Sequence, residues 1–187
     1  MQQAFILNVQ LLDVEPTVQR RIVVSSDTLL PKLHKILQAV MGWEDAHMHQ
    51  FIVGRTFYCS PIPEFMENAV NSKAVKIGQL LQRKGSKILY EYDFGDGWMH
   101  EIKLEKTVDP NDYPTLPLCL AGENACPPED CGGPWGFAEL METLKHPEDP
   151  GYPDAIEWLG EDYSPQLFDL EAVQKMLKRL QEKKGKN

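Results

Sequence analysis

The sequence has little of what membrane proteins and broad nucleic-acid binders require. No run of apolar residues approaches the roughly 18 that a membrane-spanning helix needs, so no membrane association is expected. Only five arginines occur, and the formal net charge is −9. Because phosphate binding depends on clustered lysine and arginine, this charge argues against a broad nucleic-acid surface, and nucleic acid is not expected as a partner.

Several catalytic motifs are also missing. The sequence contains no H-E-x-x-H, no glycine loop of the kind that cradles phosphate and no nucleophile elbow, so an enzyme is the less favoured class. The N-terminus lacks the basic region, apolar core and cleavage site of a secretory signal. We therefore expect a cytoplasmic protein, in which thiols stay reduced.

What is present predicts one α+β domain over residues 1–187. Hydrophobic residues make up 42% of the chain and charged residues 25%, which is ordinary for a globular protein. Alternating apolar positions predict strands at 4–12, 19–24 and 47–53. Helical periodicity predicts a packed N-terminal helix that ends at Gly42, and a helical C-terminal third with segments at 137–144, 154–159 and 169–180. The expected sheet is mainly antiparallel.

The strongest local pattern is a β-hairpin over residues 88–105. Two β-rich runs flank Gly95-Asp96-Gly97, and a three-residue loop there would pair Tyr92 with His100 and Tyr90 with Ile102. This register gathers the large apolar side chains on one face, whereas a one-residue slip would turn them to the other side. We therefore expect the aromatic face to point inward.

Residues 109–135 form a long run rich in proline and glycine, which in a compact domain is usually functional or disordered. Cys119, Cys126 and Cys131 lie in it with the spacing C-x6-C-x4-C. In a reducing compartment they are candidates for a zinc site, but they lack the usual CxxC spacing and a local fourth ligand. Packing as small hydrophobic side chains is the alternative.

Acidic and histidine residues supply the other candidate ligands. Glu129 and Asp130 stand between prolines and glycines, where they could face a cation or could instead accept hydrogen bonds from nearby backbone. His47 and His49 project from one face if they lie on a strand, and such a pair can bind metal.

Three stretches together resemble the plasmid pRiA4b ORF-3-like family. They are TLLPKLHKILQAVMGWEDAHMHQF at 28–51, YEYDFGDGWMHEIKLE at 90–105 and CLAGENACPPEDCGGPWGFAEL at 119–140. The resemblance spans nearly the whole chain and implies a single α+β domain with an antiparallel sheet. Some relatives are labelled as passenger proteins of mobile elements, and the family carries no established activity.

Two classes of function follow from these patterns. The first is a binding or interaction module for a protein or small molecule, with a pocket between the 88–105 hairpin and the 109–135 loop lined by aromatic side chains that include Phe137. Its candidate binding residues are Tyr92, Asp93, Asp96, Trp98, His100, Glu129, Asp130 and Trp135. The second is a metal-dependent hydrolase that uses Asp93, Asp96, His100, Glu129 and Asp130. A nucleic-acid-binding accessory protein associated with a mobile element is a weaker alternative.

Overall fold

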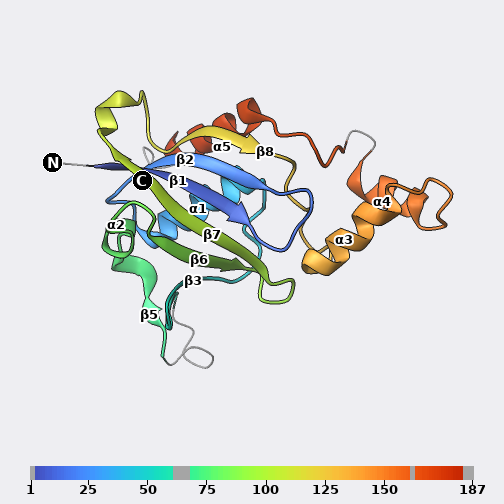
Figure 1. The fold of residues 1–187 in the computed structure, drawn as a ribbon, viewed down its shortest axis with the longest axis horizontal. Helices are drawn as coiled ribbons and strands as arrows, with labels where there is room; N and C mark the ends of the chain where they lie inside the picture. The colour runs from blue at the N-terminus through green and yellow to red at the C-terminus, as the bar shows by residue number, and fades with distance from the viewer. Residues whose placement is uncertain (1–2, 61–67, 161–162, 183–187) are drawn as a thin grey trace.

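In the computed structural model, which describes residues 3–60, 68–160 and 163–182, one twisted sheet runs through the molecule (Figure 1). Its eight strands lie in the order β5-β4-β3-β6-β7-β1-β2-β8, and all neighbours are antiparallel except β4 and β5. The strands are β1 Ala4–Leu11, β2 Gln19–Ser25, β3 His49–Val53, β4 Thr56–Cys59, β5 Val70–Asn71, β6 Lys87–Tyr92, β7 Trp98–Val108 and β8 Leu118–Glu123. The α+β class and the mainly antiparallel sheet are confirmed.

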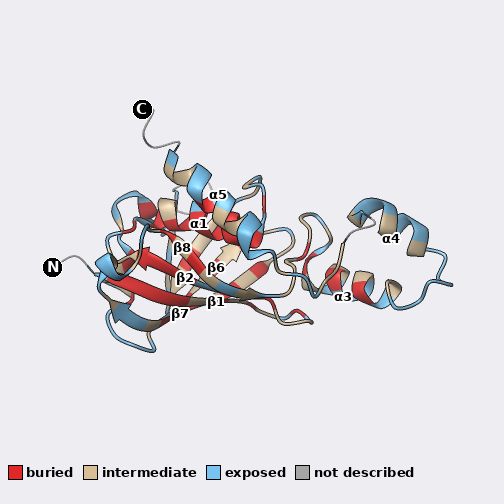
Figure 2. Cartoon of the chain, turned by 90° about the horizontal axis from the view of Figure 1, so that it is seen from above, coloured by how far each residue is buried: buried red, intermediate tan, exposed pale blue. Residues whose placement is uncertain are grey.

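Helices cover one face of the sheet and extend beyond one of its ends. The α-helices are α1 Leu30–Met41, α2 Ile77–Leu80, α3 Gly133–Thr143, α4 Tyr152–Leu159 and α5 Leu170–Glu182, with short 3-10 turns at Ser72–Ala74 and Pro110–Asp112. Figure 2 shows α1 and α5 above the sheet, with their buried sides turned toward it, and α3 and α4 as an arm beyond the end of the strands. Glycine 42 has φ of 90° and ends α1 as expected.

The main core lies between α1 and the aromatic face of the hairpin. Tyr90, Tyr92, Trp98 and Ile102 are fully buried there, so the inward orientation of this face is confirmed. A second, smaller core lies on the opposite face of the sheet, around Ala4, Ile6 and Val23, with Tyr113, Leu116, Leu118 and Leu120 packed against it.

The hairpin register differs from the expected one by two residues. Tyr92 pairs with Trp98, and Tyr90 pairs with His100, so five residues from Asp93 to Gly97 form the turn. The loop is longer because Asp93 leaves the strand with φ of 56° and its side chain accepts a hydrogen bond from the Gly95 N–H (2.9 Å). A shift of two residues preserves the alternation of side chains, which is why the faces are as expected although the pairs are wrong.

The irregular run expected at 109–135 contains a strand. β8 pairs with β2, and α5 covers its outer edge. The Gln174 side-chain amide donates to the Cys119 carbonyl (2.5 Å), and that of Gln181 donates to the Pro117 carbonyl (3.2 Å). These bonds satisfy carbonyl groups that an uncovered edge strand would expose.

A buried arginine joins three elements of the fold. The Arg20 guanidinium donates to the carbonyls of Val40 in α1 (2.8 Å) and Glu123 in β8 (2.7 Å), and it lies over the Phe168 ring at 4.4 Å. Carbonyl oxygens and an aromatic face thus replace the water that a charged group loses on burial.

None of the helices in the described part of the chain combines the length and apolarity needed to cross a bilayer.

Candidate functional site

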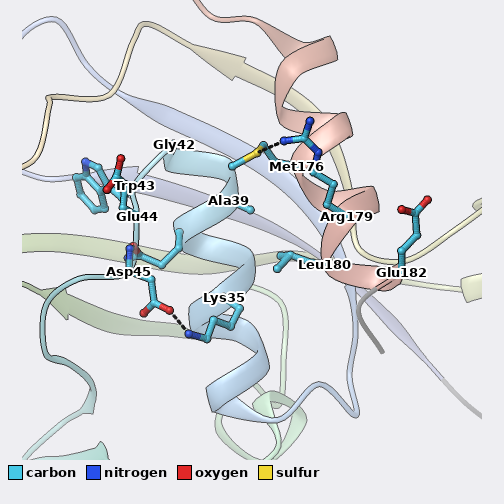
Figure 3. A pocket seen from close by; sticks show the side chains of 11 residues that line it. Lys35, Ala39, Gly42, Trp43, Glu44, Asp45, Met176, Arg179, Leu180 and Glu182 are labelled. Atoms are coloured by element: carbon cyan, nitrogen blue, oxygen red, sulfur yellow. Dashed lines mark hydrogen bonds and ion pairs between the residues drawn. The ribbon is translucent and has the colours of Figure 1, made fainter. Parts of the chain in front are cut away.

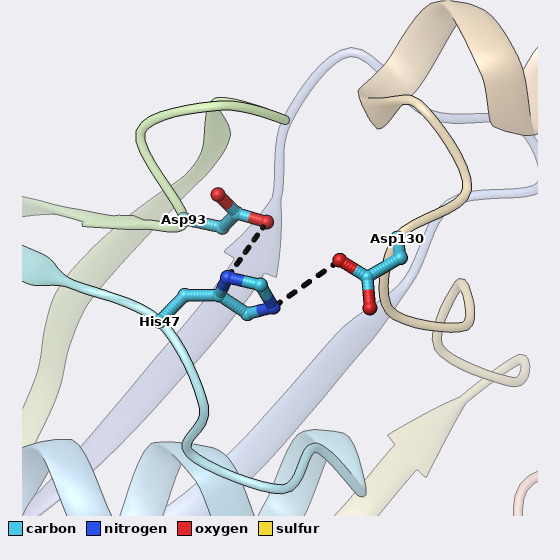
Figure 4. A group of neighbouring side chains, drawn as sticks. All are labelled: His47, Asp93 and Asp130. Carbon is cyan, nitrogen blue, oxygen red and sulfur yellow. Dashed lines mark ion pairs between the residues drawn. The ribbon is translucent and has the colours of Figure 1, made fainter.

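Three side chains from separate segments meet at the end of the sheet where the β6–β7 turn lies (Figure 4). His47 lies in the loop that leads into β3, Asp93 follows β6 directly, and Asp130 lies between β8 and α3. One ring nitrogen of the histidine and one oxygen of each carboxylate lie within 4.8 Å of one another. Among the described residues, this is the one group of three or more such ligands that comes together.

Both aspartates have left-handed backbone conformations. The φ angles are 56° at Asp93 and 60° at Asp130, in a region where residues other than glycine are uncommon. Asp93 uses Oδ1 to accept from the Gly95 N–H, and its Oδ2 lies 3.5 Å from His47 Nδ1. The turn that bends the backbone therefore also directs the second carboxylate oxygen toward the histidine.

Glu129 holds the two loops of the site together. Its Oε1 accepts a hydrogen bond from the Tyr92 hydroxyl, and its Oε2 accepts one from the Glu44 N–H (2.8 Å). Close by, the Trp43 indole N–H donates to the Pro127 carbonyl (2.9 Å). These bonds tie residues 43–47 to residues 127–130 and bring Asp130 opposite His47.

The two carboxylates approach different nitrogens of the His47 ring. His47 Nε2 lies 3.3 Å from Asp130 Oδ1, and His47 Nδ1 lies 3.5 Å from Asp93 Oδ2, both longer than the roughly 2.9 Å of an N–H···O bond. One ion can bind only one of these two nitrogens, and one ring nitrogen lies within 4.8 Å of an oxygen of each carboxylate. An imidazole with carboxylates is a donor set that zinc, manganese and iron accept.

A hollow of about 450 Å³ adjoins the group. His47 and Asp130 line it, so two members of the ligand group form part of the wall of the hollow. Its other lining residues are Met41, Gly42, Trp43, Glu44, Ala46, Cys126, Pro127, Pro128, Glu129 and Tyr163. Among all of these, three are acidic and His47 is the only base, which favours a cation over an anion.

Two donors face this hollow in their protonated forms. The Tyr163 hydroxyl is buried and has no hydrogen-bond partner among the described residues, and burial raises its pKa to about 12. Burial also raises the pKa of the Cys126 thiol well above its usual range. At neutral pH both groups therefore keep their protons.

A larger hollow of about 1190 Å³ lies between α1 and α5 (Figure 3). Trp43 lines it as well, so this residue forms part of the wall of both hollows. Two cations of the larger hollow have partners in its lining: Lys35 forms an ion pair with Asp45, and Arg179 Nη1 lies 3.7 Å from Met176 Sδ. The lining of this larger hollow does not include His47, Asp93 or Asp130.

The structure separates the candidate residues into three sets. Asp93 and Asp130 lie in the ligand group, and Glu129 lies beside it. Tyr92, Trp98 and His100 are fully buried in the core, and Phe137 is 1% exposed. None of these four residues lines the hollow. Asp96 packs at the turn, where its buried Oδ2 has no hydrogen-bond partner in the described part of the chain, and Trp135 is 89% exposed.

The histidine pair is divided between two environments. His47 joins the ligand group, whereas His49 stacks on His34 with ring centroids 3.4 Å apart. The segment does not start as a strand until His49, and the irregular backbone before it turns His47 away from the alternation that would place both rings on one face.

The three cysteines of the 109–135 run do not form a ligand group with one another among the described residues. All of them are free thiols, and Cys119 packs in the main core. Burial raises the pKa of Cys119 to about 11 and that of Cys131 to about 12. A metal would have to displace these protons before a thiolate could bind it.

Sequence reasoning missed Trp43, Glu44 and Tyr163 as part of the site. Trp43 follows the glycine that ends α1, and an aromatic residue at a helix end is a signal that could have been used. Tyr163 is brought to the hollow only by the path of the chain between α4 and α5, and no local pattern marks it.

Comparison with known proteins gives relatives without a known activity. The chain is 38% identical over 159 residues to an uncharacterised protein, y4hQ, of Sinorhizobium fredii (strain NBRC 101917 / NGR234), covering 82% of this chain and 79% of the relative. It is also similar to the crystal structure of MM3350, a protein of unknown function from Methanosarcina mazei Go1, with a TM-score of 0.83 and 35% identity. That match covers 91% of this chain and 97% of the other.

Residues 3–172 match the profile of the family described as plasmid pRiA4b ORF-3-like protein. The match includes the hairpin, the cysteine-containing loop and all three members of the ligand group. The chain belongs to the plasmid pRiA4b ORF-3-like family.

Proposed function

We propose that the protein binds a divalent transition-metal ion between His47, Asp93 and Asp130, and that the ion holds a small ligand in the adjoining hollow. The observation that carries this proposal is the convergence of three ligand atoms within 4.8 Å from three separate segments. Two of these residues also line the hollow, so coordination positions left open by the protein would face a ligand there.

The donor set supports a transition metal over magnesium or calcium. Magnesium and calcium prefer oxygen ligands, whereas an imidazole nitrogen suits zinc, manganese and iron. The two carboxylates together would balance the charge of one divalent ion. We also propose that this binding takes place in the cytoplasm, which the three free thiols of the 109–135 run support.

The geometry supports binding better than hydrolysis. A metal-dependent hydrolase needs a base that can take a proton from water at the ion. Both oxygens of Glu129 already accept hydrogen bonds, and His100 lies fully buried in the core. Asp96 likewise lies outside the ligand group.

Metal binding can be measured on untagged protein that has been treated with EDTA and dialysed. We expect Mn²⁺ and Zn²⁺ to raise the melting temperature and to bind with a stoichiometry near one by calorimetry, whereas Mg²⁺ at the same concentration has a much smaller effect. An ion at about 100 times its Kd would stabilise the folded state by about 2.7 kcal/mol.

The matched variants are His47→Ala and His146→Ala. His146 is exposed on the arm and contacts Glu142 and Glu148, so its removal should leave metal binding unchanged. His47→Ala should abolish the stabilisation by metal. The proposal is wrong if the wild-type protein binds neither Mn²⁺ nor Zn²⁺, or if His47→Ala binds them as tightly as His146→Ala does.

A further inference from the structure

A row of cationic side chains crosses the sheet on the face opposite α1. The strand register places Lys87 beside Lys103, Lys103 beside Asn8, and Asn8 beside Arg21. These positions alternate with the buried core positions, so their side chains leave the sheet on its outer face. Because neighbouring strands lie about 4.8 Å apart, the row from Lys87 to Arg21 is about 14 Å long.

The cations continue into a shallow hollow of about 810 Å³ at the same corner of the sheet. Its lining includes Arg21, Lys84, Lys103 and Lys106. Arg21 forms an ion pair with Glu105 (2.6 Å). Lys87 forms one with Glu101 (2.8 Å), which lies in the neighbouring row of the sheet.

Three of these cations lack such a partner. Lys84, Lys103 and Lys106 are exposed and form no ion pair with any described carboxylate. Like charges gathered on a sheet repel one another, and a bound anion would remove that repulsion. In a chain of net charge −9, this corner is a local exception.

An apolar row starts from the same strand, β6, and runs across the sheet in the other direction. Leu89 in β6 pairs with Ile52 in β3, which pairs with Phe57 in β4. All three side chains are half-buried or exposed on the outer face, and Phe57 is 42% exposed. Phe57 in β4 lies three strands, or about 14 Å, from Lys103 in β7. A flexible single-stranded nucleic acid can place phosphates on the cations and stack a base on this exposed ring.

The opposite end of the same strands is acidic. Asp93 directly follows the end of β6, while Lys87 begins it, so the metal site and the cationic corner lie at opposite ends of the hairpin (Figure 1). A long duplex laid along the sheet would meet the carboxylates of the far end. The anion that fits is therefore a short segment with few phosphates.

We propose that the cationic corner binds a single-stranded nucleic acid segment. Phosphates lie on Lys84, Lys103, Lys106 and Arg21, and a base stacks on Phe57. An acidic protein segment is the competing partner, but its carboxylates would make no use of the exposed ring. This inference does not depend on the metal site, because the two surfaces share no residue.

The test is fluorescence anisotropy with a labelled oligo(dT) of about 12 nucleotides, a length within the range that one single-strand-binding surface covers. We expect micromolar binding at low salt. With three to four phosphates engaged, the logarithm of the affinity should fall with the logarithm of salt concentration with a slope of about −2 to −3.

Matched charge reversals locate the surface. The double variant Lys103→Glu/Lys106→Glu should lose at least about tenfold in affinity. Lys84 lies in a loop, and Lys84→Glu should lose several-fold. The control Lys175→Glu/Lys178→Glu changes the net charge equally at exposed positions on α5 and should stay within about twofold of the wild-type affinity.

Phe57→Ala and a poly-glutamate peptide separate stacking from charge. Phe57→Ala should weaken binding of oligo(dT) several-fold, and poly-glutamate of matching charge should compete poorly. The proposal is overturned if oligo(dT) does not bind at low salt, if the α5 control loses as much affinity as the Lys103/Lys106 variant, or if poly-glutamate binds as tightly as the oligonucleotide.

Discussion

Glu129 shows how one side chain can organise a site without belonging to it. Each of its oxygens accepts one hydrogen bond, from the Tyr92 hydroxyl and from the Glu44 N–H. The Tyr92 hydroxyl in turn accepts from the Ala46 N–H (3.1 Å). Burial and the bond to Glu129 raise the pKa of Tyr92, which keeps its proton available for that bond.

Glu129→Gln should therefore destabilise the protein and weaken the metal site. An amide has only one accepting end, so one of its two partners would meet an N–H group instead. We expect the free energy of unfolding, measured with urea, to fall by about 1–3 kcal/mol. Mn²⁺ affinity should fall with it, because Asp130 is the next residue.

The control for this change is Glu44→Gln in the same hollow. Its carboxylate is exposed and only its backbone N–H takes part in the Glu129 contact. Equal losses of stability in the two variants would show that the change of charge matters, and not the paired hydrogen bonds.

Buried histidines predict that the protein loses stability in mild acid. The hydroxyl of Tyr90 donates to His34 Nδ1 (2.8 Å), and His34 Nε2–H donates to Asp45 Oδ1 (2.5 Å), a pattern that uses the neutral ring. Burial, and then Lys35, lower the pKa of His34 to about 3, and burial lowers that of His100 to about 4.

Above a pH of about 6.5 these histidines are neutral in both the folded and the unfolded chain, so they add no dependence on pH. Below this pH, the histidines bind protons in the unfolded chain but not in the folded chain. The free energy of unfolding should then fall by about 1.4 kcal/mol per pH unit for each histidine, down to a pH of about 4 for His100 and about 3 for His34.

Urea unfolding of the wild type and of His100→Phe at a series of pH values tests this dependence. Between pH values of about 6 and 4.5, the decline in the variant should be shallower by about 1.4 kcal/mol per pH unit. A decline of the same steepness in both proteins would mean that His100 is not held neutral by the fold.

At the scale of elements, the start of α3 fixes the position of the arm against the hairpin turn. Gly133 has φ of 69°, and a Cβ on it would lie 2.2 Å from the carbonyl oxygen of Asp96. The backbone of the helix start and that of the turn are therefore in direct contact. This contact places the loop that carries Asp130 next to the turn that follows Asp93.

Gly133→Ala should separate these two segments, and Gly160→Ala is its control. Gly160 also has a positive φ (86°), but no atom lies within 4 Å of its Cβ position. Because Gly160 also has ψ of 146°, an alanine there lies near a region that glycine alone adopts readily, and the control should lose about 1–3 kcal/mol through backbone strain alone. Gly133→Ala should lose about 1–3 kcal/mol more through the clash, together with metal affinity.

Thermal unfolding and Mn²⁺ titration of both variants measure these differences. If the two variants are equally stable and bind the ion equally well, the close contact between α3 and the turn does not position the site.

Elements with a regular pattern could be predicted from the sequence, and those that depend on distant partners could not. The periodicity in α1 and the alternation in β1 and β6 depend on burial of one face, which the residue order records. β8 was missed because prolines at 114 and 117 precede it, prolines at 127 and 128 follow it, and its hydrogen bonds are to β2, about a hundred residues earlier. The turn length was missed because it depends on one Asp93 hydrogen bond.

At the scale of the whole molecule, the candidate site likewise combines residues that the sequence indicates with contacts that only the fold creates. Asp93 and Asp130 could be named from the sequence because each stands in a turn rich in glycine or proline. Their meeting with His47 depends on strand order and on Glu129, and neither leaves a periodic signal. Trp98 and His100 are equally conspicuous in the sequence, but the inward face of the hairpin places them in the core.

The distribution of charge is also a property of the whole fold. Net charge averages over faces, and the total of −9 conceals the gathering of Arg21, Lys84, Lys103 and Lys106 at one corner. The register of four strands brings these residues together from three distant stretches of the chain.

The cover that α5 gives to β8 has a consequence for synthesis on the ribosome. The strand leaves the exit tunnel some fifty residues before the glutamines that occupy its outer carbonyls. During that interval the nascent chain presents an open β-edge to its neighbours on the polysome, so chaperone occupancy should be greatest after Glu123 emerges and should fall once Gln181 has emerged as well.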